Sequence, residues 1–175
     1  MDPLALLQEA EARFRGRVEP VRLEGAERET WSGLGFRLGA LRLAAPLAEV
    51  AEILEPPRLT RVPHTKPWLL GVGNVRGTLL PVVDLHGLLY DTPTPPGPRR
   101  RVIAAEHGDL RAGLLVEEAY GMVHFPEEER AAVLPALGDA VRPYLVRAYW
   151  HEGGYWGVVS VRALLASERF LNVAG

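Results

Sequence analysis

Two side chains, Asp84 and His86, could act together in chemistry. They stand two positions apart after an apolar run, so on a β-strand both would project from one face. A carboxylate beside an imidazole could hold a metal ion or serve a hydrolase. A structural carboxylate with local hydrogen bonds is the favoured interpretation, because no further ligand stands at metal-binding spacing. The other histidines are scattered, at His64, His107, His124 and His151.

A second candidate is the glycine-rich segment 71–85, which reads GVGNVRGTLLPVVDL. A dinucleotide cradle of the G-x-G-x-x-G type needs a third glycine at position 76, where Arg76 stands. The residues that follow are aliphatic and include Pro81, which predicts a strand in place of the required helix. The Gly-Lys-Ser/Thr of a P-loop occurs nowhere in the chain. We therefore expect no cofactor.

The remaining reactive side chains fit no catalytic motif. The three serines, Ser32, Ser160 and Ser167, lie outside any G-x-S-x-G sequence. The basic triplet 99–101 follows a proline-rich loop and is more typical of a solvated strand entry than of a phosphate clamp. We expect no enzyme, no catalytic residue and no metal site.

Composition indicates a globular protein without an electrostatic target. The 175 residues are 47% hydrophobic and 24% charged, and 20 Lys and Arg against 22 Asp and Glu give a net charge of −2. This balance argues against nucleic acid or an anionic membrane as a partner. No apolar run approaches the roughly 18 residues of a membrane span, and there is no cysteine. We expect a cytoplasmic protein.

Residues 1–30 are predicted to be an N-terminal helix and linker, and residues 31–175 the main domain. Asp2 and Pro3 suit a helix start. Leu4, Leu7 and Phe14 then share one helical face. The polar stretch after Gly16 has no clear period.

The main domain shows a succession of hairpin patterns. Alternating apolar residues flank Gly39–Ala40, a turn at 74–77 separates two apolar runs, and Gly108–Asp109 and Gly153–Gly154 divide later pairs. Pro81 suggests that its strand is an edge strand or carries a bulge.

Three further elements complete the expectation. A short helix is predicted at 47–54 (LAEVAEIL), and another at 162–171 (RALLASERFL). Two proline-rich stretches, 55–67 and 92–98, are predicted loops. Repeated hairpins with few helices indicate antiparallel β architecture, as barrels or a sandwich.

Several of these segments together resemble the CheW-like adaptor domain of bacterial chemosensory arrays, from about residue 30 to the C-terminus. They are FRLGALRLAAPLAEVAEIL, a proline-bearing loop, GVGNVRGTLLPVVDL, RVIAAEHGDLRAGLLVEEAYGMV and GVVSVRALL. The resemblance implies a mainly β fold of two small five-stranded SH3-like β-barrels around a shared hydrophobic core.

The function implied by the resemblance is scaffolding without chemistry. Such adaptors connect the cytoplasmic tip of a methyl-accepting chemotaxis receptor to the regulatory domain of a CheA-type histidine kinase, so the protein would be cytoplasmic and associated with membrane-bound receptor arrays. TWSGLGFRLG, TRVPHTKPW and GMVHFP bring it nearer the family members that serve type IV pilus twitching motility. A flagellar chemotaxis role is the alternative.

Three residues carry the implied interface. Val50 and Glu52 would face the receptor, and Arg76 would contribute to partner contacts nearby. An aliphatic side chain supplies desolvated contact area, and charges at its edge select the partner. Val50 could instead pack into the core, since a helical stripe also directs it inward, and Arg76 could be an ordinary turn residue.

The chain departs from the family pattern at two places. Val116–Glu117 stands where a Val-Asp pair is usual, and Ser160 replaces a common Asp or Asn. Two other classes also stay open. A small ligand- or nucleic-acid-binding barrel requires Arg99–Arg101, Arg111 and Arg147 to form one basic patch. A hydrolase requires Asp84 and His86 to converge on a pocket.

Overall fold

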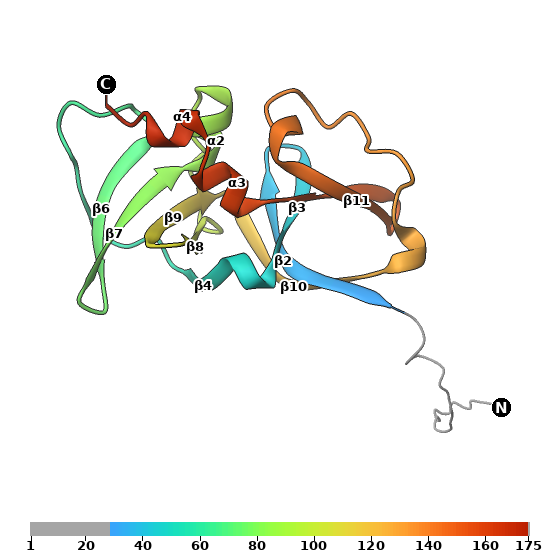
Figure 1. The fold of residues 1–175 in the computed structure, drawn as a ribbon. Helices are drawn as coiled ribbons and strands as arrows, with labels where there is room; N and C mark the ends of the chain where they lie inside the picture. The colour runs from blue at the N-terminus through green and yellow to red at the C-terminus, as the bar shows by residue number, and fades with distance from the viewer. Residues whose placement is uncertain (1–28, 175) are drawn as a thin grey trace. The chain divides into compact units, whose positions relative to one another are not determined.

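The computed structural model describes residues 29–174, and Figure 1 shows their fold. The described residues form two compact units, a small one of 29–31 with 124–130 and a large one of 32–123 with 131–174. In the small unit, Trp31 stacks on Phe125 with ring centroids 6.0 Å apart. The helix predicted near the N-terminus lies outside the described residues and stays a prediction.

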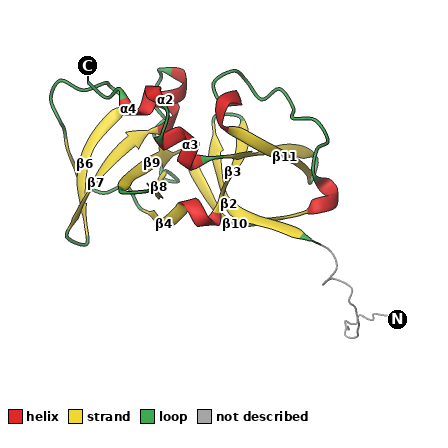
Figure 2. Cartoon of the chain, viewed as in Figure 1, coloured by secondary structure: helices red, strands yellow, loops and turns green. Residues whose placement is uncertain are grey.

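Strands dominate the described chain, as expected (Figure 2). The strands are β2 (Thr30–Leu38), β3 (Leu41–Pro46), β4 (Val50–Leu54), β5 (Leu59–Thr60), β6 (Leu69–Val75), β7 (Thr78–Asp84), β8 (Arg101–His107), β9 (Leu110–Val116), β10 (Glu118–Pro126), β11 (Leu145–His151) and β12 (Gly154–Val159). The short helices are η2 (Leu47–Glu49), α2 (Leu85–Tyr90), η3 (Glu127–Glu129), η4 (Arg142–Tyr144), α3 (Val161–Leu165) and α4 (Glu168–Leu171).

The strands form two sheets, with the orders β10-β2-β3-β12-β11 and β4-β8-β9-β7-β6-β5. The first has five strands as expected, and the sixth strand of the second is the two-residue β5. The mainly β fold class is confirmed. The purely antiparallel expectation is wrong, because β3 pairs in parallel with β12 and β7 with β9. Hairpin patterns reveal only the pairing of strands that follow each other in the sequence. The strands of these two parallel pairs are far apart in the sequence.

The predicted hairpins are confirmed. The turns at Gly39–Ala40 and Gly108–Asp109 join β2 to β3 and β8 to β9. The turn between β6 and β7 centres on Arg76 and Gly77. The last turn lies one position earlier than expected, because Gly154 already pairs with His151 in the β11–β12 ladder.

The helix predicted at 47–54 is wrong beyond its first turn. Residues 47–49 form η2, and Val50–Leu54 form strand β4, which pairs antiparallel with β8. The apolar residues of this segment suit a helical stripe and also a strand with period two. Backbone pairing with β8, which is distant in sequence, decides between them.

Pro81 lies in a strand that is interior to its sheet. β7 runs between β6 and β9, but its pairing with β9 begins only at Val82. The missing N–H of Pro81 therefore falls before that ladder starts. The β6–β7 ladder also has a register shift, between Leu69 and Gly71, so the irregularity is on the partner strand.

The C-terminal helix forms in two pieces. The hydroxyl oxygen of Ser160 accepts a hydrogen bond from the Ala163 N–H (3.1 Å) and caps α3, and that of Ser167 accepts from the Phe170 N–H (3.2 Å) and caps α4. A serine that caps a helix adopts an extended backbone, which ends the preceding helix.

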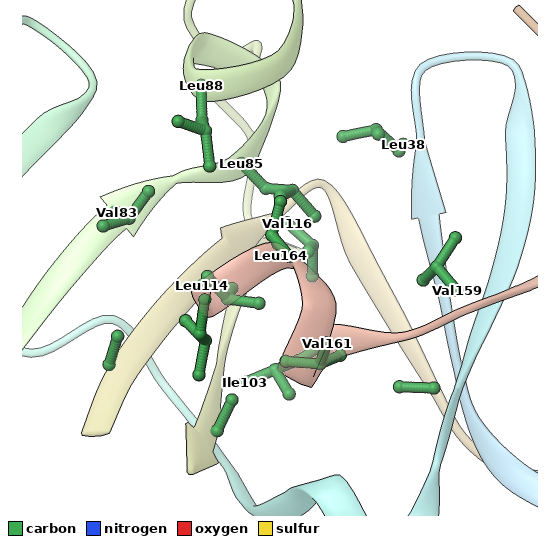
Figure 3. Packing of buried hydrophobic residues seen from close by; sticks show 14 of the residues in the cluster. Leu38, Val83, Leu85, Leu88, Ile103, Leu114, Val116, Val159, Val161 and Leu164 are labelled. Carbon is green, nitrogen blue, oxygen red and sulfur yellow. The ribbon is translucent and has the colours of Figure 1, made fainter. Parts of the chain in front are cut away.

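One hydrophobic core is shared by the two sheets, as the family resemblance implied (Figure 3). Val161 and Leu164 of α3 lie beside Ile103 and Leu114 of the six-stranded sheet. Leu38 and Val159 extend the cluster to the five-stranded sheet. Full burial of each such side chain stabilises the fold by about 1.5–3 kcal/mol, so α3 is a structural link between the sheets.

Candidate functional site

The β6–β7 turn holds Arg76 away from the sheet. Arg76 and Gly77 have φ angles of 51° and 82°, the left-handed conformations of a two-residue hairpin turn of type I′. The side-chain oxygen of Asn74 accepts a hydrogen bond from the Gly77 N–H at 2.9 Å, which fixes the turn. The Arg76 side chain is 68% exposed.

Glu52 meets Arg76 across the surface of the six-stranded sheet. Glu52 lies on β4, opposite Ala104 of β8, and its side chain is 29% exposed. Its carboxylate accepts a hydrogen bond from the Arg76 guanidinium, so the two form an ion pair. The structure therefore brings together two of the three residues named from the family resemblance.

Val50 lies on the same strand in a different setting. It is half-buried, faces Ala105 in the ladder and packs in part against the shared core. Part of the Val50 side chain therefore packs into the core, as the alternative interpretation expected. The element that directs it there is a strand and not a helix. The remainder of the side chain is accessible.

A surface pocket surrounds the ion pair. Its lining residues are Glu52, Leu54, Val75, Arg76, Thr78, Leu80, Ala104 and Arg111. The Arg111 Nε atom lies 3.1 Å from a carboxylate oxygen of Glu106. Two guanidinium groups and one carboxylate thus border the pocket, an arrangement that suits a charged, hydrogen-bonding partner.

One residue of this pocket, Arg111, was not predicted from the sequence to belong to it. Leu79, which is 68% exposed on β7, points away from the pocket, because its neighbours Thr78 and Leu80 line it. No local sequence pattern pointed to Arg111, because the pairing of β7 with β9 brings it to the pocket.

The glycines of segment 71–85 serve strand packing. A Cβ atom on Gly71 would lie 2.5 Å from the Thr60 carbonyl oxygen, and one on Gly73 would lie 3.1 Å from the Leu59 side chain. Both glycines therefore let β5 approach β6 closely. This segment continues into a strand and not a helix, so it lacks the helix N-terminus that a phosphate cradle requires.

Asp84 and His86 belong to separate hydrogen-bond networks. Asp84 is only 3% exposed, and its carboxylate accepts hydrogen bonds from the Gly87 N–H (3.0 Å), the Thr94 N–H (2.9 Å) and the Thr94 hydroxyl (2.6 Å). His86 Nδ1 lies 2.7 Å from the Thr92 carbonyl oxygen. Asp84 lines a pocket that His86 does not line, so the geometry gives a hydrolase pair no support. Within residues 29–174, no group of three or more His, Asp or Glu could hold a metal ion.

Three of the arginines proposed for a basic patch, Arg99, Arg101 and Arg111, have acceptors within the chain. Arg99 lies 3.8 Å from the Glu118 carboxylate, and Arg111 pairs with Glu106. Arg101 donates to the Arg100 carbonyl at 2.7 Å. These contacts disfavour a nucleic-acid-binding patch, which needs guanidinium groups directed at phosphates.

Both departures from the family pattern keep a hydrogen-bond acceptor in place. The Glu117 carboxylate accepts from the Gly39 N–H at 2.9 Å and lies 3.5 Å from Arg37. Ser160 caps α3, a task for which Asp and Asn are equally suited.

Two mixed sheets around one core, with a charged surface pocket at a hairpin turn, define a small, mainly β domain. The chain belongs to the CheW-like family, since the CheW-like domain matches residues 32–169. It is 40% identical to Protein PilI of Pseudomonas aeruginosa over 172 residues, which cover 98% of this chain and 96% of that protein.

Two further similarities follow, of which the first agrees with this membership and the second shows the fold. The chain is 30% identical over 133 residues to the chemotaxis protein CheW of Bacillus subtilis, covering 76% of this chain and 85% of that protein. The crystal structure of the scaffolding protein TtCheW from Thermoanaerobacter tengcongensis matches with a TM-score of 0.69 at 18% identity, over 81% of this chain and 96% of that chain. Among the described residues, no helix has the length and apolar character needed to cross a membrane.

Proposed function

We propose that the protein is a non-catalytic adaptor, which couples the cytoplasmic tip of a methyl-accepting chemotaxis receptor to the regulatory domain of a CheA-type histidine kinase. Membership of the CheW-like family supports this role. The observation that carries it is the exposed Glu52–Arg76 ion pair, formed by an edge strand and a hairpin turn. Such a pair contributes little to folding, so a partner is the better reason for its position.

In this proposal Arg76, Glu52 and Val50 form the partner-binding surface. A partner that covers the ion pair removes water from both charges, which strengthens their interactions and penalises a partner of the wrong charge. The accessible part of Val50 would add apolar area to the contact. The adaptor would work in the cytoplasm at receptor arrays, with no cofactor, no nucleic acid and no insertion into the membrane.

The pathway we propose is the one that controls type IV pilus twitching motility. The similarity to Protein PilI along nearly the whole chain supports this assignment. A flagellar chemotaxis role is the second candidate, supported by the similarity to the chemotaxis protein CheW of Bacillus subtilis. Deletion of the gene in its own organism separates the two, because the first predicts loss of surface twitching and the second loss of swimming chemotaxis.

Calorimetry with purified components tests the adaptor role. The titrants are the cytoplasmic fragment of a receptor and the regulatory domain of the CheA-type kinase, both from the same organism. The proposal predicts saturable binding of each, weakened by Arg76→Glu. The matched control is Arg142→Glu, because Arg142 also forms an exposed ion pair, with Asp139 at 3.1 Å. Absence of binding to both titrants by the folded wild-type protein would contradict the proposal.

A further inference from the structure

Glu49 is bonded to a helix that is remote in sequence. One oxygen of its carboxylate, Oε1, accepts hydrogen bonds from the Val161 N–H at 2.7 Å and from the Arg162 N–H at 3.1 Å. These two N–H groups belong to the first turn of α3, where a helix leaves its backbone donors without intrahelical acceptors. A half-buried carboxylate that accepts two backbone N–H bonds makes a strong, charge-assisted contact.

The helix α3 also donates a side-chain hydrogen bond to η2. The Arg162 guanidinium donates to the Ala48 carbonyl oxygen at 3.2 Å, so η2 and α3 hold each other at two points. The third N–H of the helix start, that of Ala163, is bonded to the Ser160 hydroxyl. Glu49 and Ser160 thus share the capping of α3, but only Glu49 belongs to another part of the fold.

The hydrogen bonds of Glu49 with Val161 and Arg162, called here the Glu49–α3 clasp, connect the partner-binding surface to the core. Glu49 immediately precedes Val50 and lies three positions before Glu52. On the other side, Val161 and Leu165 are buried in the core shared by the two sheets. β4 belongs to the six-stranded sheet, whereas α3 follows directly from β12 of the five-stranded sheet.

The first half of β4 is irregularly paired. The β4–β8 ladder has a register shift between Val50 and Glu52, so regular backbone pairing is interrupted where the surface begins. The preceding η2 has no side-chain cap of its own, and Leu47 is 43% exposed. The two hydrogen bonds that Glu49 accepts from α3 lie immediately before this irregular part of the ladder.

We infer that Glu49 is a positioning residue for partner binding, which holds the first half of β4 in its binding conformation by accepting the two amide hydrogens of α3. The inference rests on the proposed adaptor function and adds a residue that touches no partner itself. Without the Glu49–α3 clasp, β4 must be ordered when the partner binds, and that ordering lowers affinity.

Three variants of the full-length protein separate positioning from folding. Glu49→Ala removes both bonds to α3. Glu49→Gln keeps an oxygen that can accept them but loses the charge. Ser160→Ala weakens the same helix start without touching β4. We expect receptor-fragment and kinase-domain affinities about tenfold lower for Glu49→Ala, within about threefold of wild type for Glu49→Gln, and unchanged for Ser160→Ala.

Binding is measured by calorimetry at a temperature where circular dichroism shows every variant to be folded. Amide hydrogen exchange supplies the second readout, because positioning predicts faster exchange at the β4 residues of Glu49→Ala than of Ser160→Ala. If Glu49→Ala does not fold, Glu49→Asp replaces it, since its carboxylate is one methylene short of α3.

The outcomes separate this inference from the proposed function. If the wild-type protein binds and Glu49→Ala binds equally well, the role of Glu49 is overturned and the adaptor function stands. Equal losses in Glu49→Ala and Ser160→Ala would also overturn it, because helix stability alone would then explain both. No binding by wild type would contradict the adaptor function first.

Discussion

Arg76 and Glu52 form an ion pair although 24 positions separate them in the chain. The hairpin turn at Arg76 and the pairing of β4 with β8 bring them together. Both side chains keep solvent contact, and exposed pairs contribute only about 0–1 kcal/mol to folding. Because this ion pair stabilises the fold so little, its position is better explained by a role in partner binding.

Arg76→Glu is expected to lower partner affinity without unfolding the protein. The free energy of unfolding should fall by no more than about 1 kcal/mol, since an exposed ion pair is lost. Loss of a central interface arginine often costs about 2 kcal/mol, or roughly thirtyfold in affinity. Urea denaturation and calorimetry measure the two effects separately. A large loss of stability would show that Arg76 is a structural residue.

The double variant Arg76→Glu with Glu52→Arg tests whether the ion pair or its orientation matters. It restores opposite charges, so stability should return to the wild-type value in urea denaturation. Affinity should stay low, because the partner then meets each charge at the wrong position. Full recovery of binding would contradict this prediction, because the partner would then not depend on which position carries which charge.

Asp84→Ala is expected to destabilise the protein by about 3 kcal/mol, because buried donors on Gly87 and Thr94 lose their acceptor. The midpoint of urea denaturation measures this loss. Thr94→Val is the matched control, since it removes only the hydroxyl bond to Asp84 and should cost about 1 kcal/mol. Equal midpoints for wild type and Asp84→Ala would refute a structural role for this carboxylate.

Gly71→Ala is expected to destabilise the fold by about 2 kcal/mol or more, because the backbone must shift to admit the side chain. The Gly71 φ of 147° disfavours a side chain, and the new Cβ would lie 2.5 Å from the Thr60 carbonyl oxygen. Gly97→Ala is the control, because its Cβ would meet nothing within 4 Å. Thermal denaturation of both should show a lowered midpoint for Gly71→Ala alone.

Tyr120 is expected to ionise above its usual range. Burial raises the pKa of Tyr120 above its ordinary value of 10.0, and the Glu118 carboxylate raises it further. The folded state therefore keeps a proton that the unfolded state loses, so this contribution to stability is complete below pH 10.0 and decreases as pH rises through the folded pKa. The difference in ultraviolet absorbance between wild type and Tyr120→Phe should titrate with a midpoint above 10.0. A midpoint below that value would contradict it.

Local patterns in the sequence were sufficient to predict the hairpins and the mainly β fold. Turns such as Gly108–Asp109 are specified by a few neighbouring residues, and their strands pair with each other. The helix predicted at 47–54 failed because the pattern suits two periods and the partner strand β8 begins only at Arg101. The parallel pairs of β3 with β12 and β7 with β9 were not visible for the same reason.

The candidate site was predictable only in part. The family resemblance indicated Val50, Glu52 and Arg76, and the turn residues around Arg76 explained its exposure. Nothing in the sequence pairs Glu52 with Arg76, or Glu49 with α3, because such contacts depend on how the sheets assemble.

Co-sedimentation of the kinase with receptor-bearing vesicles tests the adaptor role most directly. Purified CheA-type kinase is mixed with vesicles that carry the receptor's cytoplasmic domain, with and without this protein. The adaptor role predicts that wild-type protein brings the kinase into the pellet and that Arg142→Glu does so equally, whereas Arg76→Glu leaves most of it in the supernatant. Kinase sedimentation that is the same with and without the wild-type protein would contradict the account.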